Sequence, residues 1–200
     1  MKKIIIYALV SLIALVFYIS YQIKKNISDV NENGIVAGDI VFSDGSFCHK
    51  SDYETSDLSK NPIAVVYKSA EKVYVVGLMK GNGLMFQTNT SSDINDFEKG
   101  YAVVNNLTGD FASGWHTPSI DELIDLYENR TVVDDSIKAI NNKKSNYADE
   151  LGKSYYWSNK EDSQMEDIGW AMDFSNGNIF FFLKTSCISC RLIKEMEIII

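Results

Sequence analysis

The 200-residue sequence is poor in proline, histidine and cysteine and carries no excess of positive charge. It has two prolines and no repeat at a fixed period, which argues against solenoids and propellers. The formal net charge of -8 argues against a nucleic-acid partner, because phosphate binding requires clustered Lys and Arg. The sequence also lacks a phosphate loop, a dinucleotide fingerprint and a nucleophile elbow, so the common nucleotide-binding and hydrolase signatures are missing.

What the sequence does contain is enough apolar material for one folded domain and an accessory segment. Hydrophobic residues make up 46% and aromatic residues 12%, which excludes a disordered chain. We expect a membrane anchor or signal segment over residues 1–25, a polar linker over 26–33, a domain over 34–196 and a tail over 197–200.

The first segment contains an uncharged stretch, residues 4–23, between two pairs of lysines. Twenty helical residues rise about 30 Å, the thickness of a bilayer core. The exit from this stretch, residues 17–22, has no small residues at the spacing of a cleavage site. We therefore predict an uncleaved transmembrane helix with the domain outside the cytoplasm, periplasmic or at the cell surface. The alternative is a cleaved signal peptide and a secreted domain.

The clearest local signal is the start of a helix at residues 114–127. Ser119 is a suitable N-cap, Glu122 follows three positions later, and Pro118 lies just outside, which together indicate a capping box. Apolar residues then recur at helical spacing, namely Ile120, Leu123, Ile124 and Tyr127.

Other patterns indicate an α+β domain. Further helices are predicted over 93–107, with Phe97, Tyr101, Val104 and Leu107 on one face, and over 135–142. Strands are predicted over 40–42, 46–48, 63–67, 73–78, 84–87, 155–158, 170–174, 179–183 and 188–193. Turns are predicted at 43–45, 81–83 and 175–178, and a loop over 51–61.

Four motifs together resemble one known family. The segment Gly114–Leu123 is similar to the Gly-Trp-Arg-Leu-Pro-Thr-x-x-Glu-Leu signature of the Legionella collagen-like protein C-terminal domain family. Tyr156–Ser158, Trp170–Gly177 and Cys190–Lys194 resemble later motifs of that family in the same order, and Gly38–Gly45 resembles its opening hairpin. The likeness covers residues 34–196.

This resemblance implies a C-type lectin-like fold with two to three helices and twisted antiparallel sheets, distantly similar to the formylglycine-generating enzyme. It also implies an exported bacterial protein that attaches to glycans or surfaces. The structural motif positions are Trp115, Pro118, Ser119, Glu122, Trp157, Trp170, Gly177 and Arg191. The sequence departs from the family at His116-Thr117, where Arg-Leu is usual, so any contact made by that Arg is lost.

The predicted ligand-binding residues are Asn159, Glu161 and Asp162, in an acidic loop between two strands, together with Trp157. Tryptophan can stack on a sugar ring, but it equally serves core packing. Calcium could be held by the acidic loop, although such a run is usually only a solvated loop. The Glu-Pro-Asn and Trp-Asn-Asp tripeptides of calcium-dependent lectins are missing. No cofactor, metal site or catalytic residue is predicted.

The Cys187-x-x-Cys190 pair is the sharpest chemical hint, because such a pair can be a redox dithiol or half of a metal site. In a continuous strand, however, residues three apart point to opposite faces. Cys48 is the third thiol, and the sequence leaves the pairing among the three open. The alternatives to a reactive pair are buried cysteines with a structural role and a single disulfide.

Three functional hypotheses result. The first is a membrane-anchored, non-enzymatic binding module for a surface glycan or an envelope or host protein. The second is a thiol-dependent or copper-binding enzyme, related to the formylglycine-generating enzyme fold, that uses Cys187 and Cys190. The third is a structural envelope component that only packs against its neighbours.

Overall fold

The computed structural model describes residues 34–55, 59–86 and 93–197. The predicted anchor and linker, residues 1–33, and the last three residues of the predicted tail lie outside this description. Among the described residues, no helix has the length and apolar character needed to cross a membrane.

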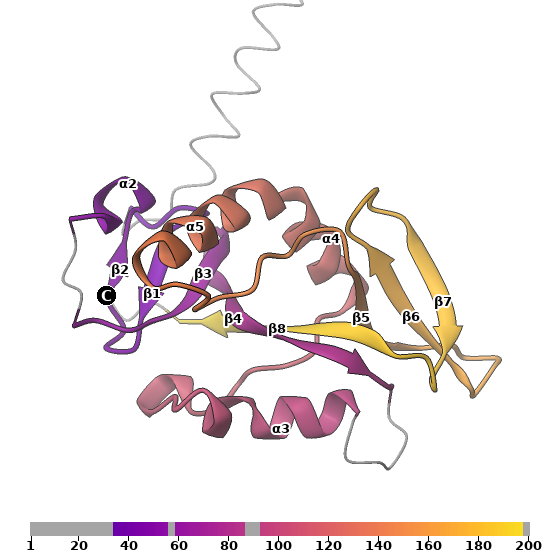
Figure 1. Ribbon diagram of the computed structural model, residues 1–200. Coiled ribbons are helices and arrows are strands. Elements are labelled where there is room, and N and C mark those ends of the chain that lie inside the picture. Colours follow the sequence, from indigo (N-terminus) through magenta and orange to yellow (C-terminus); the bar gives the residue numbers. More distant parts are fainter. Residues whose placement is uncertain (1–33, 56–58, 87–92, 198–200) are drawn as a thin grey trace, which may run out of the picture.

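The described chain forms one twisted eight-stranded sheet in the order β2-β1-β3-β4-β8-β5-β6-β7, which confirms the α+β class (Figure 1). Its strands are β1 Ile40–Phe42, β2 Phe47–Cys48, β3 Pro62–Ser69, β4 Val73–Leu84, β5 Tyr155–Glu161, β6 Ile168–Asp173, β7 Ile179–Leu183 and β8 Ile188–Met196. Neighbouring strands are antiparallel except β5 and β8, which meet in parallel at Tyr156 and Ser189. The prediction of antiparallel sheets is wrong at this one pairing, because residues 184–187 lead the chain from β7 into β8 without reversing its direction.

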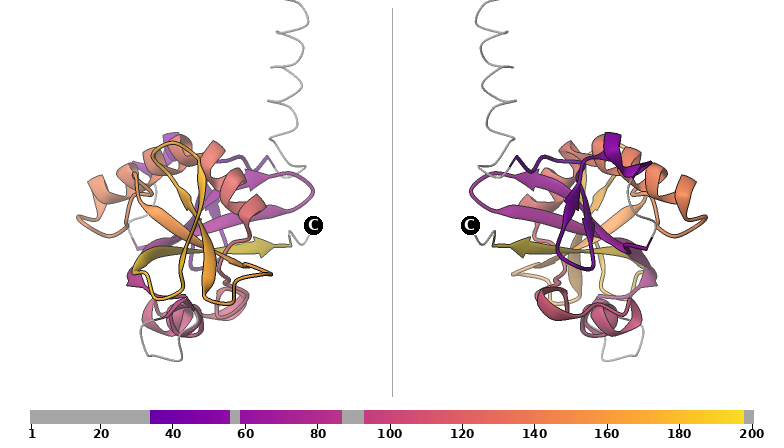
Figure 2. Two further views of the ribbon diagram at one scale, coloured as in Figure 1. Left: turned by 90° about the vertical axis from the view of Figure 1, so that its right-hand side faces the viewer. Right: turned by 90° about the vertical axis from the view of Figure 1, so that its left-hand side faces the viewer.

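Helices cover both faces of this sheet, as the end-on views in Figure 2 show. Helix α3 (Ile94–Val104) lies on one face, and α4 (Ile120–Glu128) and α5 (Arg130–Lys143) lie on the other. Successive strand residues point to opposite faces, so Val66 joins the core under α3 while Val65 joins the core under α4 and α5. The core is thus two apolar layers that share one sheet.

Strand β4 is longer than the sequence suggests. Residues 81–83 were expected to form a turn before a strand over 84–87, but β4 runs through them to Leu84. Its register against β8 shifts twice, between Val76 and Lys80 and between Gly81 and Leu84. Glycines inside a strand mark such bulges as well as turns, and Gly83 adopts a φ of 65°.

Two further differences concern helices. The short helix α2 (Lys50–Tyr53) lies where a loop over 51–61 was expected, and α5 begins at Arg130 instead of residue 135. In α3, Tyr101 is buried as predicted, but Val104 is 78% exposed and therefore does not belong to the inward face. In α5, Val133, Ile137 and Ile140 are all fully buried.

Candidate functional site

The family-like motif carries the chain from the α3 side of the sheet to the α4 side (Figure 1). His116 exchanges two backbone hydrogen bonds with Ile193 of β8, of 2.9 and 3.0 Å. The backbone amide of Thr117 donates to Glu98 of α3 at 2.8 Å, and the Pro118 carbonyl accepts from the Asn159 amide at 2.7 Å. Residues 115–118 therefore fix the mutual position of α3, β8 and β5, which is the mechanical role of this motif.

The capping box predicted at the start of α4 is present. The Ser119 side chain accepts from the Glu122 amide at 3.3 Å, and the Glu122 carboxylate accepts from the Ser119 amide at 2.8 Å. The other Glu122 oxygen lies 3.2 Å from Nε2 of His116. This hydrogen bond lowers the pKa of Glu122 to about 2 and raises the pKa of His116 above its ordinary value. When protonated, His116 therefore forms an ion pair with Glu122.

This ion pair predicts a specific pH dependence of stability. Because the folded pKa of His116 is raised, its contribution is fully present below the unfolded value of 6.5 and is lost as the pH rises through the folded value. The lowered pKa of Glu122 sets the other limit, since its contribution is present above 4.5 and lost as the pH falls towards about 2. We expect the free energy of unfolding to fall by roughly 0.5 kcal/mol between pH 5.5 and pH 8.5, since the pair is partly exposed.

Urea unfolding of the wild type and of His116→Arg at both pH values measures this effect. Arginine stays protonated throughout, so the variant should lose the His116 share of the pH dependence while the contributions of other groups cancel in the comparison. An equal pH dependence in both proteins would contradict the ion pair.

The three tryptophans lie differently from one another. Trp157 is fully buried, and its indole N–H donates to the Leu84 carbonyl at 2.8 Å. This corrects the prediction of Trp157 as a ligand contact, because no part of the ring reaches the surface. Trp115 is buried as well, while Trp170 is half-buried with Lys160 over its ring at 5.1 Å. Core packing accounts for Trp115 and Trp157.

The remaining motif positions are Gly177 and Arg191. Gly177 has a φ of 79°, and a Cβ there would lie 2.6 Å from the ring of Tyr127, so the hairpin between β6 and β7 requires glycine. Arg191 is fully buried and donates from one Nη to the Asp149 carbonyl at 2.8 Å. Its Nε and other Nη have no hydrogen-bond partner among the described residues.

The acidic loop begins at the end of β5 and is exposed. Glu161 forms an ion pair with Lys184 at 2.7 Å, and the Asp162 carboxylate accepts from the amides of Gln164 and Met165 in a local turn. Asn159 is exposed and is tied to the Pro118 carbonyl through its backbone. The carboxylates of Glu161 and Asp162 thus stabilise the conformation of the loop. Within residues 34–55, 59–86 and 93–197, no three His, Cys, Asp or Glu side chains gather as a metal-binding set.

The three cysteines are free thiols in very different surroundings. Cys187 is exposed, Cys48 is half-buried and Cys190 is fully buried. Burial raises the pKa of Cys190 to about 12, and its sulfur lies 3.8 Å from the Thr117 hydroxyl. Three strands separate β2 from β8, so four spacings of about 4.8 Å keep Cys48 far beyond the roughly 7 Å limit for a disulfide with Cys190.

One pair of titratable residues was not expected from the sequence. Asp39, whose side chain is 3% exposed, lies 2.6 Å from Nδ1 of His49, which is 53% exposed. The hairpin pairs Ile40 with Cys48, so Asp39 and His49 stand one step further along the same register. That register was the available signal, because the hairpin itself was predicted. The neighbouring Cys48 thiol donates to the His49 backbone carbonyl at 3.3 Å.

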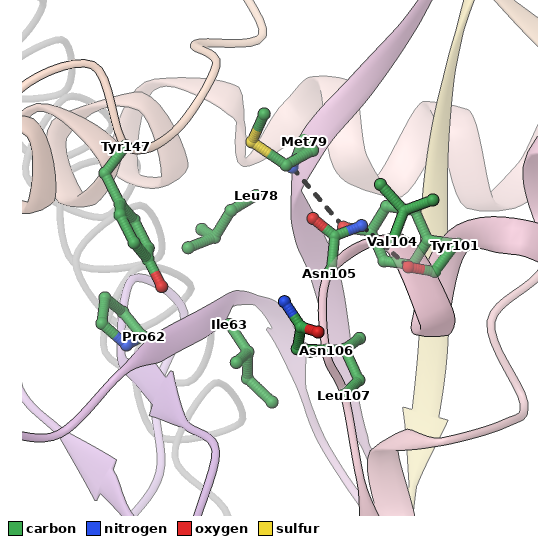
Figure 3. A pocket seen from close by; sticks show the side chains of 10 residues that line it. All are labelled: Pro62, Ile63, Leu78, Met79, Tyr101, Val104, Asn105, Asn106, Leu107 and Tyr147. Atoms are coloured by element: carbon green, nitrogen blue, oxygen red, sulfur yellow. Dashed lines mark hydrogen bonds between the residues drawn. The ribbon is translucent and has the colours of Figure 1, made fainter.

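A pocket of about 270 Å³ opens beside the C-terminal end of α3 (Figure 3). Ten residues line this Asn105 pocket: Pro62, Ile63, Leu78, Met79, Tyr101, Val104, Asn105, Asn106, Leu107 and Tyr147. Tyr147 lies on one side and the two asparagines on the other, with Leu78 and Ile63 between them. The pocket therefore offers polar groups at its two sides and apolar side chains between.

The two asparagines differ in how their amides are used. Asn105 caps α3 and donates from Nδ2 to the Tyr101 carbonyl at 2.8 Å. Asn106 is exposed with a φ of 53°, and no group among the described residues hydrogen-bonds its amide. Sequence reasoning missed this pocket because its walls come from β3, β4, the end of α3 and residue 147.

Comparison of the sequence with protein-family models and with curated proteins finds no match. The family likeness thus depends on the motifs alone. Of these, the helix start and the β6–β7 hairpin have clear structural roles, in the capping box of α4 and in the contact between Gly177 and Tyr127.

Proposed function

We propose that this protein is a non-catalytic binding module of the bacterial cell envelope, related to the Legionella collagen-like protein C-terminal domain family. Residues 4–23 would anchor it in the membrane and hold the domain outside the cytoplasm. The mixed fold, with helices on both faces of a twisted sheet, is compatible with the C-type lectin-like architecture that the motifs suggest. The ligand would be a surface glycan, and neither nucleic acid nor a cofactor is involved.

The Asn105 pocket is the observation that carries this proposal. Small-ligand sites combine apolar walls with a few well-placed polar groups, and here the amides of Asn105 and Asn106 and the hydroxyl of Tyr147 take that part. A volume of about 270 Å³ lies just below the roughly 300–1,000 Å³ typical of drug-sized ligands. It therefore suits a single small unit, such as the terminal sugar of a glycan.

The chemistry of the walls matches such a unit. The Asn106 amide, which has no hydrogen-bond partner in the part of the chain that the structure describes, provides two N–H donors and a carbonyl acceptor, which can bond neighbouring sugar hydroxyls. The Tyr147 ring and the Met79, Val104 and Leu78 side chains provide apolar surface for the C–H face of a sugar ring. None of the described residues that line the pocket has an ionised side chain, so a neutral ligand is favoured over a charged one.

Substitution of Asn106 by glycine is the sharpest test of this site. Asn106 has a φ of 53°, a conformation that glycine adopts freely, so Asn106→Gly removes the amide without straining the backbone. We expect about ten-fold weaker binding, corresponding to the loss of one or two hydrogen bonds. Asn146→Gly is the matched control, because Asn146 has a φ of 54° and does not line the pocket.

The measurement is a glycan array probed with the full chain in mild detergent, followed by titration of the best-binding sugar. Wild type and Asn146→Gly should bind alike, and Asn106→Gly more weakly. Equal binding by all three proteins would remove the pocket from the proposal. Binding that is lost in chelator would instead favour a calcium-assisted site at Asn159, Glu161 and Asp162. No binding to any glycan would overturn the proposed ligand class and leave the structural envelope role.

A further inference from the structure

Among the described residues, strand β7 forms a free edge of the sheet, and it is entirely apolar. It ends the strand order, and its sequence is Ile-Phe-Phe-Phe-Leu over Ile179–Leu183. Proteins usually protect such an edge with a charged residue, a proline, a bulge or a covering element. Within β7 there is no charge or proline, and its five pairs with β6 run without a register shift. An unprotected apolar edge is typical of a strand that pairs with another chain.

Apolar side chains are exposed on both faces of this edge. On one face, Phe181 is 60% and Leu183 is 56% exposed, and Ile179 is 39% exposed. On the opposite face, Phe180 is 40% exposed and packs with Tyr155, which is itself 40% exposed. Figure 1 shows β7 at the right-hand margin of the molecule, away from α3 and α5. A partner strand would therefore gain backbone pairing and apolar contacts on both faces.

The backbone pattern defines which groups face outward. The Asp173 amide donates to the Asn178 carbonyl at 2.9 Å, and the Lys184 amide donates to the Asp167 carbonyl at 2.8 Å. Residues bonded to a neighbour alternate along an antiparallel strand, so residues 178, 180, 182 and 184 face β6. Residues 179, 181 and 183 therefore direct their N–H and C=O groups away from the sheet. The Leu183 carbonyl already accepts from the Ser186 amide and has a second lone pair left.

We propose that β7 pairs with β7 of a second copy of this chain, antiparallel and two-fold symmetric about Phe181. The sequence of β7 reads nearly the same in both directions: Ile179 faces Leu183, Phe180 faces Phe182, and Phe181 faces its own copy. A two-fold axis at Phe181 also brings the outward-facing N–H and C=O groups of the two strands opposite each other. Residues 179, 181 and 183 then form the hydrogen-bonded pairs of the new ladder. A two-fold interface requires such self-complementarity.

The flanking residues permit this pairing. Lys184, the first charged residue after the strand, stands opposite Asn178 of the second copy, so no like charges meet. The two sheets would join into one continuous sheet with Phe181 at its centre. The interface is separate from the Asn105 pocket, which lies beside β3 and β4, with three strands between β4 and β7. Its test is therefore independent of the proposed ligand.

Mass measurement of the full chain in mild detergent, by light scattering after size exclusion, tests this proposal. We expect two chains per particle for the wild type at tens of micromolar. Phe181→Pro removes the central N–H donor of the interface. The fold of the monomer should tolerate this proline, because the N–H of residue 181 faces away from β6. Phe181→Arg adds a charge at the two-fold axis. Both should raise the dimer dissociation constant at least ten-fold, as judged from dilution series.

Val103→Arg is the matched control, because Val103 is an exposed apolar residue on α3 with 78% exposure. It should leave the dimer intact. Circular dichroism melting verifies that each variant is folded. A monomeric wild type would overturn the proposal, and so would a dimer that persists unchanged in both Phe181 variants, since a part of the chain other than β7 would then hold it together.

A disulfide test fixes the register. In the Cys187→Ser background, Phe181→Cys places two cysteines in a hydrogen-bonded pair about 5.5 Å apart at Cα, within the range of a disulfide. Mild oxidation should give a covalent dimer. Leu183→Cys should not crosslink, because its two copies lie four residues out of register, about 14 Å apart. Crosslinking of Leu183→Cys as fast as Phe181→Cys would contradict the two-fold centre.

Discussion

The Trp157→Ala substitution is expected to lower the free energy of unfolding by about 4 kcal/mol, the range measured when a buried tryptophan is truncated. Trp157 is fully buried and packs edge-on against Phe86 at 5.3 Å and Phe182 at 6.1 Å between ring centroids. Truncation leaves a cavity between β5 and the end of β4 and leaves the Leu84 carbonyl without its donor. Urea unfolding followed by far-UV circular dichroism measures the loss.

Two variants sharpen this result. Trp157→Phe keeps an aromatic ring but loses the indole N–H, so we expect a smaller loss, about 2 kcal/mol. Tyr155→Ala lies on the same strand at a 40% exposed position and should cost no more than about 1 kcal/mol. Equal losses for Trp157→Ala and Tyr155→Ala would show that Trp157 is accessible, and would restore it as a candidate sugar-stacking residue.

Thiol labelling should separate Cys187 from Cys190 by at least about a thousand-fold in rate, because the thiolate is the reacting form. Cys187 is exposed, whereas Cys190 is fully buried. Burial raises the pKa of Cys190 to about 12. At pH 8 only about one Cys190 in ten thousand is then a thiolate, before access is considered. Iodoacetamide labelling at pH 8, with mass spectrometry of the peptides, gives both rates.

Labelling in urea is the control, since all three cysteines should then react at similar rates. Rapid labelling of Cys190 in the folded protein would contradict its burial. It would also support the thiol-dependent or copper-binding alternative, which requires Cys187 and Cys190 to act together. The slow rate that we expect would weigh against that alternative, because a buried protonated thiol is neither a nucleophile nor a metal ligand.

Local signals in the sequence were sufficient where the determining contacts are near in the chain. The Ser119–Glu122 capping box and the Ile179–Leu183 strand both formed as predicted, because their hydrogen bonds and turn join residues a few positions apart. The turn predicted at residues 81–83 was wrong because glycine is common both in turns and in β-bulges. Only the pairing of β4 with β8 determines which of the two forms. The extra length of β4 is therefore a tertiary effect.

The candidate site was harder to predict for the same reason. The Asn105 pocket unites Ile63, Leu78, Asn105 and Tyr147 from four separate parts of the chain, so no spacing in the sequence indicates it. Trp157 carried an ambiguous signal, since an aromatic residue before an acidic loop suits both a core and a sugar platform. The alternation of apolar and polar residues along the strand could not distinguish a core position from a sugar-binding one. The reason is that β5 is buried on both faces over Tyr156–Ser158.

Hydrogen exchange is the most direct test of whether the Asn105 pocket is the ligand site. The full chain, in mild detergent, is compared with and without the best-binding sugar from the array, and deuterium uptake is read peptide by peptide. The amides of residues 105–107, which close the C-terminal end of α3, should exchange more slowly with the sugar bound. Slower exchange confined to residues 158–167, or no change at residues 105–107, would contradict the account.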